Sequence, residues 1–131
     1  MMKYPQLPEA ELLVMQIVWE QNNPLTSKQL LELSKPQKEW KLQTVSTLLN
    51  RLTEKGFLTS EKRGKERYYL PVVVREEYLS QETKRFVKAF HKNSISGLMA
   101  SLVSSNKVND EDLQELVTWL KERKEGEHDD G

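Results

Sequence analysis

Apolar side chains recur at helical spacing along most of the chain, and this pattern predicts six helices. They cover residues 8–21, 27–34, 40–55, 76–91, 95–103 and 110–124. The third has the clearest pattern, because its apolar residues follow i, i+3, i+4, i+7 spacing and form one stripe: Val45, Leu48, Leu49 and Leu52. Between the third and fourth helices, β-branched and aromatic residues flank a turn at Gly64, which predicts a hairpin over residues 57–70.

This order of elements, with a short extended step at Leu25, is typical of a mainly α fold with a small β-wing, in the α+β class. We expect a winged helix-turn-helix domain in residues 1–71, a helical dimerisation domain in residues 72–124 and a disordered acidic tail in residues 125–131. The three C-terminal helices are too short to bury their apolar stripes in a core of their own. Pairing with a second copy of the chain would bury these stripes. The residues expected at this interface are Phe86, Phe90, Leu98, Met99, Leu102, Val103, Leu113, Leu116, Val117 and Leu120.

The 131 residues include 20 Lys and Arg against 20 Asp and Glu, so the formal net charge is zero. A neutral total argues against a nucleic-acid partner, but the charges are unevenly spread. Residues 35–70 hold nine basic and four acidic side chains, a net charge of +5, whereas residues 109–131 hold three basic and nine acidic ones, a net charge of −6. This separation indicates two different tasks for the middle and the end of the chain.

The face of the third helix opposite the apolar stripe carries short polar side chains and an arginine. Gln43 and Asn50 can each form two hydrogen bonds with adenine, and Arg51 can contact a guanine or a phosphate. The threonines suit a phosphate or the methyl group of thymine. The pattern predicts a helix that reads the major groove of DNA, and the alternative is an ordinary solvated helix face. The candidate reading residues are Gln43, Thr44, Ser46, Thr47, Asn50 and Arg51.

Four cations surround the predicted hairpin turn: Lys62, Arg63, Lys65 and Arg67. A turn does not need this charge to fold, whereas a wing that lies on the phosphate backbone or in the minor groove does. The alternative is that lysines keep the strand edges from pairing with another chain. Of the two consecutive tyrosines that follow at 68 and 69, we expect one in the core and the other within reach of a phosphate.

No residues suited to catalysis or metal binding come together in the sequence. Cysteine is absent, the two histidines lack ligand spacing, and there is neither a Gly-rich phosphate loop nor a nucleophile elbow. We therefore expect no enzyme activity, metal, cofactor or small-molecule ligand. No apolar run reaches the length of a membrane span and no secretory signal begins the chain, so we expect a cytoplasmic location without membrane insertion.

Two runs of sequence resemble those of a known family. Residues 10–19, Ala-Glu-Leu-Leu-Val-Met-Gln-Ile-Val-Trp, are similar to the opening helix of the bacterial penicillinase and methicillin-resistance repressors, the BlaI/MecI/CopY family. Residues 44–52, Thr-Val-Ser-Thr-Leu-Leu-Asn-Arg-Leu, resemble that family's recognition helix. Lys55-Gly56 and a basic wing that ends in Tyr68-Tyr69 follow in the same order, and the likeness covers residues 7–122.

The resemblance implies a homodimeric transcriptional repressor whose DNA-binding domains each read half of an inverted-repeat operator, typically of TACA/TGTA type. In antibiotic-responsive members, a membrane-bound sensor protease cuts the repressor in its dimerisation helix, which weakens the dimer and releases the DNA. The equivalent bond here is Ser101–Leu102, where those members have Asn-Phe. The copper-responsive branch uses a C-terminal cysteine cluster, which this chain lacks.

Only some residues of the third helix match the DNA-contacting positions of the family. Thr44, Thr47 and Arg51 match DNA-contacting positions of the family, whereas Gln43 and Ser46 stand where the β-lactam repressors have basic residues. This reduced charge, together with the neutral total, leaves an alternative function: a winged-helix protein-protein interaction module that binds no DNA.

Overall fold

The computed structural model describes the backbone of residues 3–129 and the side chains of residues 3–124. The chain separates into two compact units, residues 1–83 and 84–131. A mainly helical chain with one two-stranded antiparallel sheet confirms the predicted fold class. The elements are α1 (Glu9–Glu20), α2 (Ser27–Ser34), α3 (Leu42–Glu54), β1 (Leu58–Arg63), β2 (Glu66–Pro71), α4 (Arg75–His91), α5 (Ile95–Ser104) and α6 (Asp110–Asp129).

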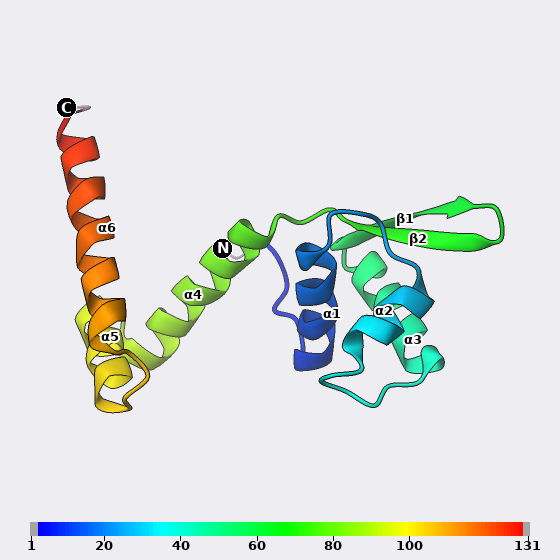
Figure 1. Ribbon diagram of the computed structural model, residues 1–131, viewed down its shortest axis with the longest axis horizontal. Helices are drawn as coiled ribbons and strands as arrows, with labels where there is room; N and C mark the ends of the chain where they lie inside the picture. The colour runs from blue at the N-terminus through cyan, green and yellow to red at the C-terminus, as the bar shows by residue number, and fades with distance from the viewer. Residues whose placement is uncertain (1–2, 130–131) are drawn as a thin grey trace. The chain divides into compact units, whose positions relative to one another are not determined.

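Helices α1, α2 and α3 pack together as the body of the first unit (Figure 1). A capping box begins α2, because the Thr26 hydroxyl accepts from the N–H of Gln29 while the Gln29 side chain accepts from the N–H of Thr26. Gly56 follows α3 with a φ of +82°, a left-handed conformation that ends a helix and suits glycine. The boundaries of both helices lie within two residues of their predicted positions.

Strands β1 and β2 form a hairpin that extends from this body (Figure 1). Arg63 pairs with Glu66, so the turn has two residues, and Gly64 has the positive φ of +66° that the first position of a type II′ turn requires. At the base of the hairpin, Leu25 pairs with Tyr69 through two backbone hydrogen bonds of 2.8 and 3.1 Å. This pairing is the short extended step that the sequence predicts.

The core of the first unit lies between the three helices and the base of the hairpin. The apolar stripe of α3 is buried within it, and Val45 and Leu52 have no exposed surface. Phe57, which is also fully enclosed, packs edge-on against Tyr78 with 5.4 Å between the ring centroids. Because the stripe holds α3 by one side only, the other side of this helix remains free for a partner.

One ion pair between α1 and the end of α3 has an almost completely buried carboxylate. The side chain of Glu11 on α1 is 3% exposed, and its carboxylate binds the ammonium group of Lys55, whose side chain is 31% exposed. Lys55 follows the last residue of α3, so the pair joins the end of α3 to α1. Because a buried carboxylate without a partner is strongly destabilising, Lys55 contributes to the stability of the domain.

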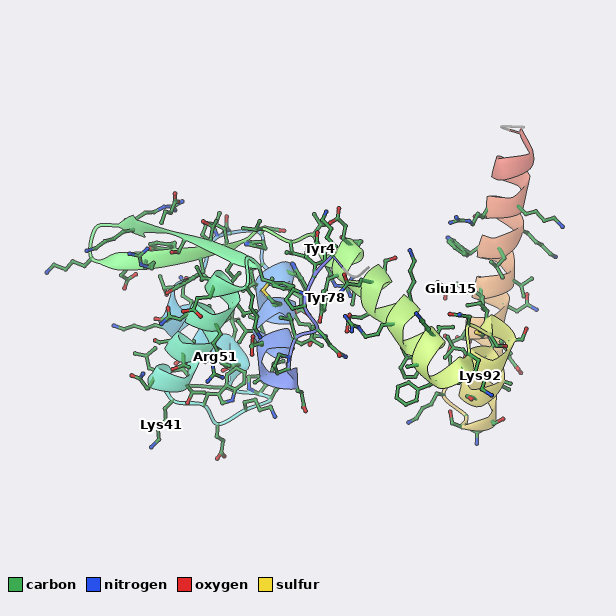
Figure 2. The ribbon with its side chains drawn as sticks, turned by 180° about the vertical axis from the view of Figure 1, so that it is seen from behind. Tyr4, Lys41, Arg51, Tyr78, Lys92 and Glu115 are labelled. Carbon is green, nitrogen blue, oxygen red and sulfur yellow. The ribbon has the colours of Figure 1, made fainter. Side chains whose placement is uncertain are left out.

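The segment that precedes α1 binds the first turns of α4. The Tyr78 hydroxyl accepts from the N–H of Leu7 at 2.8 Å, and the Gln81 side chain exchanges two hydrogen bonds with the main chain of Tyr4 (Figure 2). These contacts attach the beginning of α4 to the first unit. The first compact unit therefore extends beyond the hairpin, as far as Thr83.

The second unit contains the last part of α4 together with α5 and α6. Lys92 and Asn93 have positive φ angles of 48° and 65°, so the chain turns sharply between α4 and α5. Asn109 and Asp112 form a reciprocal capping box at the start of α6. Among the described side chains from residue 84 onward, only Val87 is buried, so the apolar stripes of these helices remain at the surface of the single chain.

Helix α6 continues to Asp129, whereas the sequence predicts a disordered tail from residue 125. Residues 121–124, Lys-Glu-Arg-Lys, are all strong helix formers and no proline follows them, so the helix continues beyond residue 124 and through Gly126. Residues 130–131 of that predicted tail lie outside the described part of the chain. Between residues 3 and 129, no helix combines the length and apolar character needed to cross a membrane.

Candidate nucleic-acid interface

All six candidate reading residues lie outside the buried stripe of α3. Four of them, Gln43, Thr44, Asn50 and Arg51, are exposed, and the other two, Ser46 and Thr47, are half-buried. A helix with one face fixed in a core and short polar groups on the rest can enter a groove of DNA without disturbing its own packing.

The polar groups of this surface are little used within the protein. The Thr47 hydroxyl donates to the Gln43 carbonyl at 3.0 Å, which leaves its lone pairs and methyl group available. The guanidinium of Arg51 (labelled in Figure 2) makes no hydrogen bond or ion pair with any other described residue. A guanidinium has five donors, so Arg51 is equipped for a base edge or a phosphate.

The two faces of the hairpin differ in charge. The strand register places Lys62 opposite Arg67, on the face that continues into the core. On the other face, Arg63 binds the Glu61 carboxylate through two of its N–H groups and lies 5.0 Å above the ring of Tyr68. Cations that are clustered in the sequence therefore lie on different faces of the hairpin, and the Glu61 carboxylate partly neutralises the charge of Arg63.

The two tyrosines of β2 are divided in the same way. Tyr69 packs against the core, whereas Tyr68 lies on the outer face beneath Arg63. The side chain that packs inward is thus the one whose backbone pairs with Leu25.

Sequence reasoning misses two further cations on this surface. The sequence begins the third helix at Trp40, which places Lys41 inside it, whereas Lys41 is the residue immediately before α3 and points into solvent (Figure 2). Lys28, in the first turn of α2, has no basic neighbour in the sequence. Only the pairing of Leu25 with Tyr69 brings Lys28 next to the hairpin.

The residues expected at a dimer interface lie on the uncovered surface of the second unit. Phe86, Phe90, Val103, Val117 and Leu120 are exposed, and Leu98, Met99, Leu102, Leu113 and Leu116 are half-buried.

The candidate cleavage bond, Ser101–Leu102, lies inside α5. The Ser101 carbonyl accepts from the N–H of Ser105 at 3.1 Å, and the Leu102 carbonyl accepts from the N–H of Lys107 at 3.2 Å. Both carbonyls are thus held in helical or helix-end hydrogen bonds.

The packed pair α2 and α3, the outward polar face of α3 and the adjoining basic hairpin define a winged helix-turn-helix domain. The chain belongs to the penicillinase repressor family, whose sequence model matches residues 7–122. This match confirms the resemblance found in the sequence.

Two relatives illustrate the extent of the likeness. The penicillinase repressor of Bacillus licheniformis is 30% identical over 95% of this chain and 96% of that protein. The methicillin resistance regulatory protein MecI of Staphylococcus aureus (strain N315) is 25% identical over 90% of this chain and 95% of that protein. Both likenesses span nearly the whole of the relative.

Solved structures match part of the chain. The solution structure of the DNA-binding domain of the repressor BlaI has a TM-score of 0.51 and 31% identity, and the match covers 60% of this chain and 94% of that one. The Bacillus licheniformis BlaI monomeric form in complex with the blaP half-operator has a TM-score of 0.50 at the same identity and coverage. The winged-helix fold is thereby confirmed.

Proposed function

We propose that this chain is a DNA-binding transcriptional repressor that binds an inverted-repeat operator as a homodimer. The observation that carries the proposal is the uncommitted polar face of α3 beside a basic hairpin face, in a domain whose fold matches that of BlaI bound to a half-operator. In this arrangement α3 reads base edges in the major groove, and the hairpin binds the phosphate backbone.

The uncovered apolar surface of the second unit supports a second copy of the chain as its partner. A single chain leaves side chains such as Phe90, which is 72% exposed, and Trp119, which is 53% exposed, in contact with water. Two copies that meet through the same surface bury these stripes against each other. The dimer then presents two DNA-binding domains, and binding of the first raises the effective concentration of the second at the other half-site.

Release of the DNA follows from any event that weakens this dimer. A membrane-bound sensor protease that cuts Ser101–Leu102 is the event that the family resemblance suggests. Proteases bind extended backbone, so α5 has to unwind before its hydrogen-bonded carbonyls become accessible. No side chain of α5 is buried in the single chain, so this unwinding costs little once the dimer opens.

Selection from a random library of duplexes tests the proposal without assuming an operator. The purified chain is mixed with the library at low salt, and bound duplexes are recovered and sequenced through several rounds. We expect an inverted repeat with two identical half-sites. If no duplex is recovered at low salt, the repressor is excluded and the alternative, a winged-helix module that binds other proteins, takes its place.

Replacement of Arg51 by alanine should weaken binding to the selected repeat by about 1–3 kcal/mol if the guanidinium contacts a base. Fluorescence anisotropy on the repeat and on a scrambled duplex measures both affinities. Arg75→Ala, which removes an exposed arginine at the start of α4, serves as the control. Equal losses on the two duplexes would assign Arg51 to a phosphate, and unchanged affinity would remove it from the interface.

The division of the hairpin cations predicts unequal effects of two matched substitutions. Lys62→Ala should weaken binding to all duplexes alike and reduce the slope of log affinity against log salt by about 1 for each protomer, or about 2 for the homodimer. Arg63→Ala should have a smaller effect, because Glu61 already neutralises part of its charge. Anisotropy titrations at several salt concentrations measure both slopes. If Arg63→Ala has the larger effect, the outer face of the hairpin is the one that contacts DNA.

A further inference from the structure

A hollow of about 230 Å³ lies between the first turn of α2 and the hairpin. We call it the α2–hairpin hollow. Its lining includes Ser27 and Lys28 from α2 and Lys65, Glu66, Arg67 and Tyr69 from the hairpin. The lining thus joins two segments that are about 40 positions apart in the sequence.

Backbone pairing holds the two walls of the hollow in place. Leu25 and Tyr69 exchange two hydrogen bonds, and α2 begins two residues after Leu25. Arg67 lies two residues before Tyr69 in β2, and therefore on the same face of the strand. The hollow is consequently a fixed feature of the domain, formed where α2 leaves the edge of the hairpin.

The hollow is positively charged. Three cations line it against one carboxylate, that of Glu66. Within the described part of the chain, neither Lys28 nor Lys65 forms a hydrogen bond or an ion pair through its ammonium group. The guanidinium of Arg67 donates one N–H to the Ser60 hydroxyl at 3.0 Å and has further donors to offer. The ligand that fits these three cations and the Ser27 hydroxyl is an oxyanion of the phosphate type.

We propose that the α2–hairpin hollow binds one phosphate of the DNA backbone, with Lys28 as a principal contact. This inference rests on the proposed DNA binding and adds a specific site to it. The hollow is continuous with the basic hairpin face, because Arg67 both lines the hollow and pairs with Lys62. The backbone of the same duplex is therefore the source of phosphate that the geometry favours over a free phosphate ion.

A phosphate in this position would fix the first turn of α2 and the hairpin to one point of the backbone. Such a contact carries no sequence information by itself. It sets the height and angle at which α3 enters the major groove, so Lys28 is a positioning residue for the reading helix.

Lys28→Gln tests the site, with Lys35→Gln as a matched control. Both substitutions remove one positive charge from an exposed lysine near an end of α2, but Lys35 lies at the opposite end and binds Glu32. The homodimer loses two phosphate contacts, one in each half-site, so the salt slope should fall by about 1.8, which corresponds to about 60-fold weaker binding at 0.1 M salt. The loss should be equal on a TACA/TGTA inverted repeat and on a scrambled duplex. Lys35→Gln should leave both the slope and the affinity nearly unchanged.

Duplexes in which single phosphates are replaced by neutral methylphosphonates locate the contact. At one position in each half-site, a methylphosphonate should weaken binding of the unaltered protein. The same methylphosphonate should not weaken binding of the Lys28→Gln variant any further. Equal behaviour of the two glutamine variants, or additive losses at every position, would overturn the site while leaving DNA binding intact. Failure of the unaltered protein to bind any duplex would overturn the proposed function, and the site with it.

Discussion

Replacing Leu102 with aspartate should separate the dimer into monomers and weaken binding to an inverted repeat by about 100-fold or more. Leu102 is half-buried in α5, on the apolar surface that we assign to the dimer interface. A second copy that covers this position would enclose a carboxylate without a partner, and an unpaired buried charge is costly. The loss of affinity follows because a monomer no longer holds both half-sites at once.

Sedimentation velocity and anisotropy measure the two parts of this expectation. The Leu102→Asp variant should sediment as a monomer and retain its affinity for a duplex with a single half-site. Ser101→Asp introduces the same charge at the neighbouring, exposed position of α5 and serves as the control. A Leu102→Asp variant that remains dimeric at low micromolar concentration would show that the interface lies elsewhere.

Replacing Lys55 with methionine should destabilise the first unit by about 3 kcal/mol. The substitution keeps the length and much of the apolar stem of the side chain, but leaves the Glu11 carboxylate, 3% exposed, without its partner. Urea unfolding followed by circular dichroism at constant protein concentration measures the change in the free energy of unfolding. The double variant Glu11→Leu with Lys55→Met should regain most of the loss, because it removes the buried charge itself.

The pair of Lys38 and Glu9 provides the matched control for this prediction. It also connects a lysine to α1, at 4.0 Å, but both side chains are largely exposed. Lys38→Met should therefore change the free energy of unfolding by less than about 1 kcal/mol. Equal effects of Lys38→Met and Lys55→Met would mean that burial of Glu11 does not determine the contribution of its partner.

The parts of the domain that follow from local patterns are predictable from the sequence. The stripe of α3 is periodic and Gly56 follows it, so the end of the helix and its buried face emerge from spacing and glycine chemistry alone. The hairpin turn at Gly64 is predictable for the same reason. These elements also place the candidate reading residues, because the polar face of α3 is the complement of its buried stripe.

Contacts between distant segments are beyond such reasoning. Lys28 joins the candidate interface only because Leu25 pairs with Tyr69, and the charge of Arg63 is partly neutralised by the neighbouring Glu61. The first compact unit extends as far as Thr83 for a similar reason, since the segment before α1 binds the beginning of α4. A charge count along the sequence contains no information about these pairings.

We propose that the chain binds an inverted repeat through the face formed by α3 and the hairpin. Anisotropy titration of a TACA/TGTA inverted-repeat duplex and its scrambled counterpart, each at low and near-physiological salt, tests it most directly. We expect tighter binding to the repeat and a steep fall of affinity as salt rises on both duplexes. Equal affinity for the two duplexes would contradict reading by α3, and absence of binding at low salt would contradict the assignment of DNA as the partner.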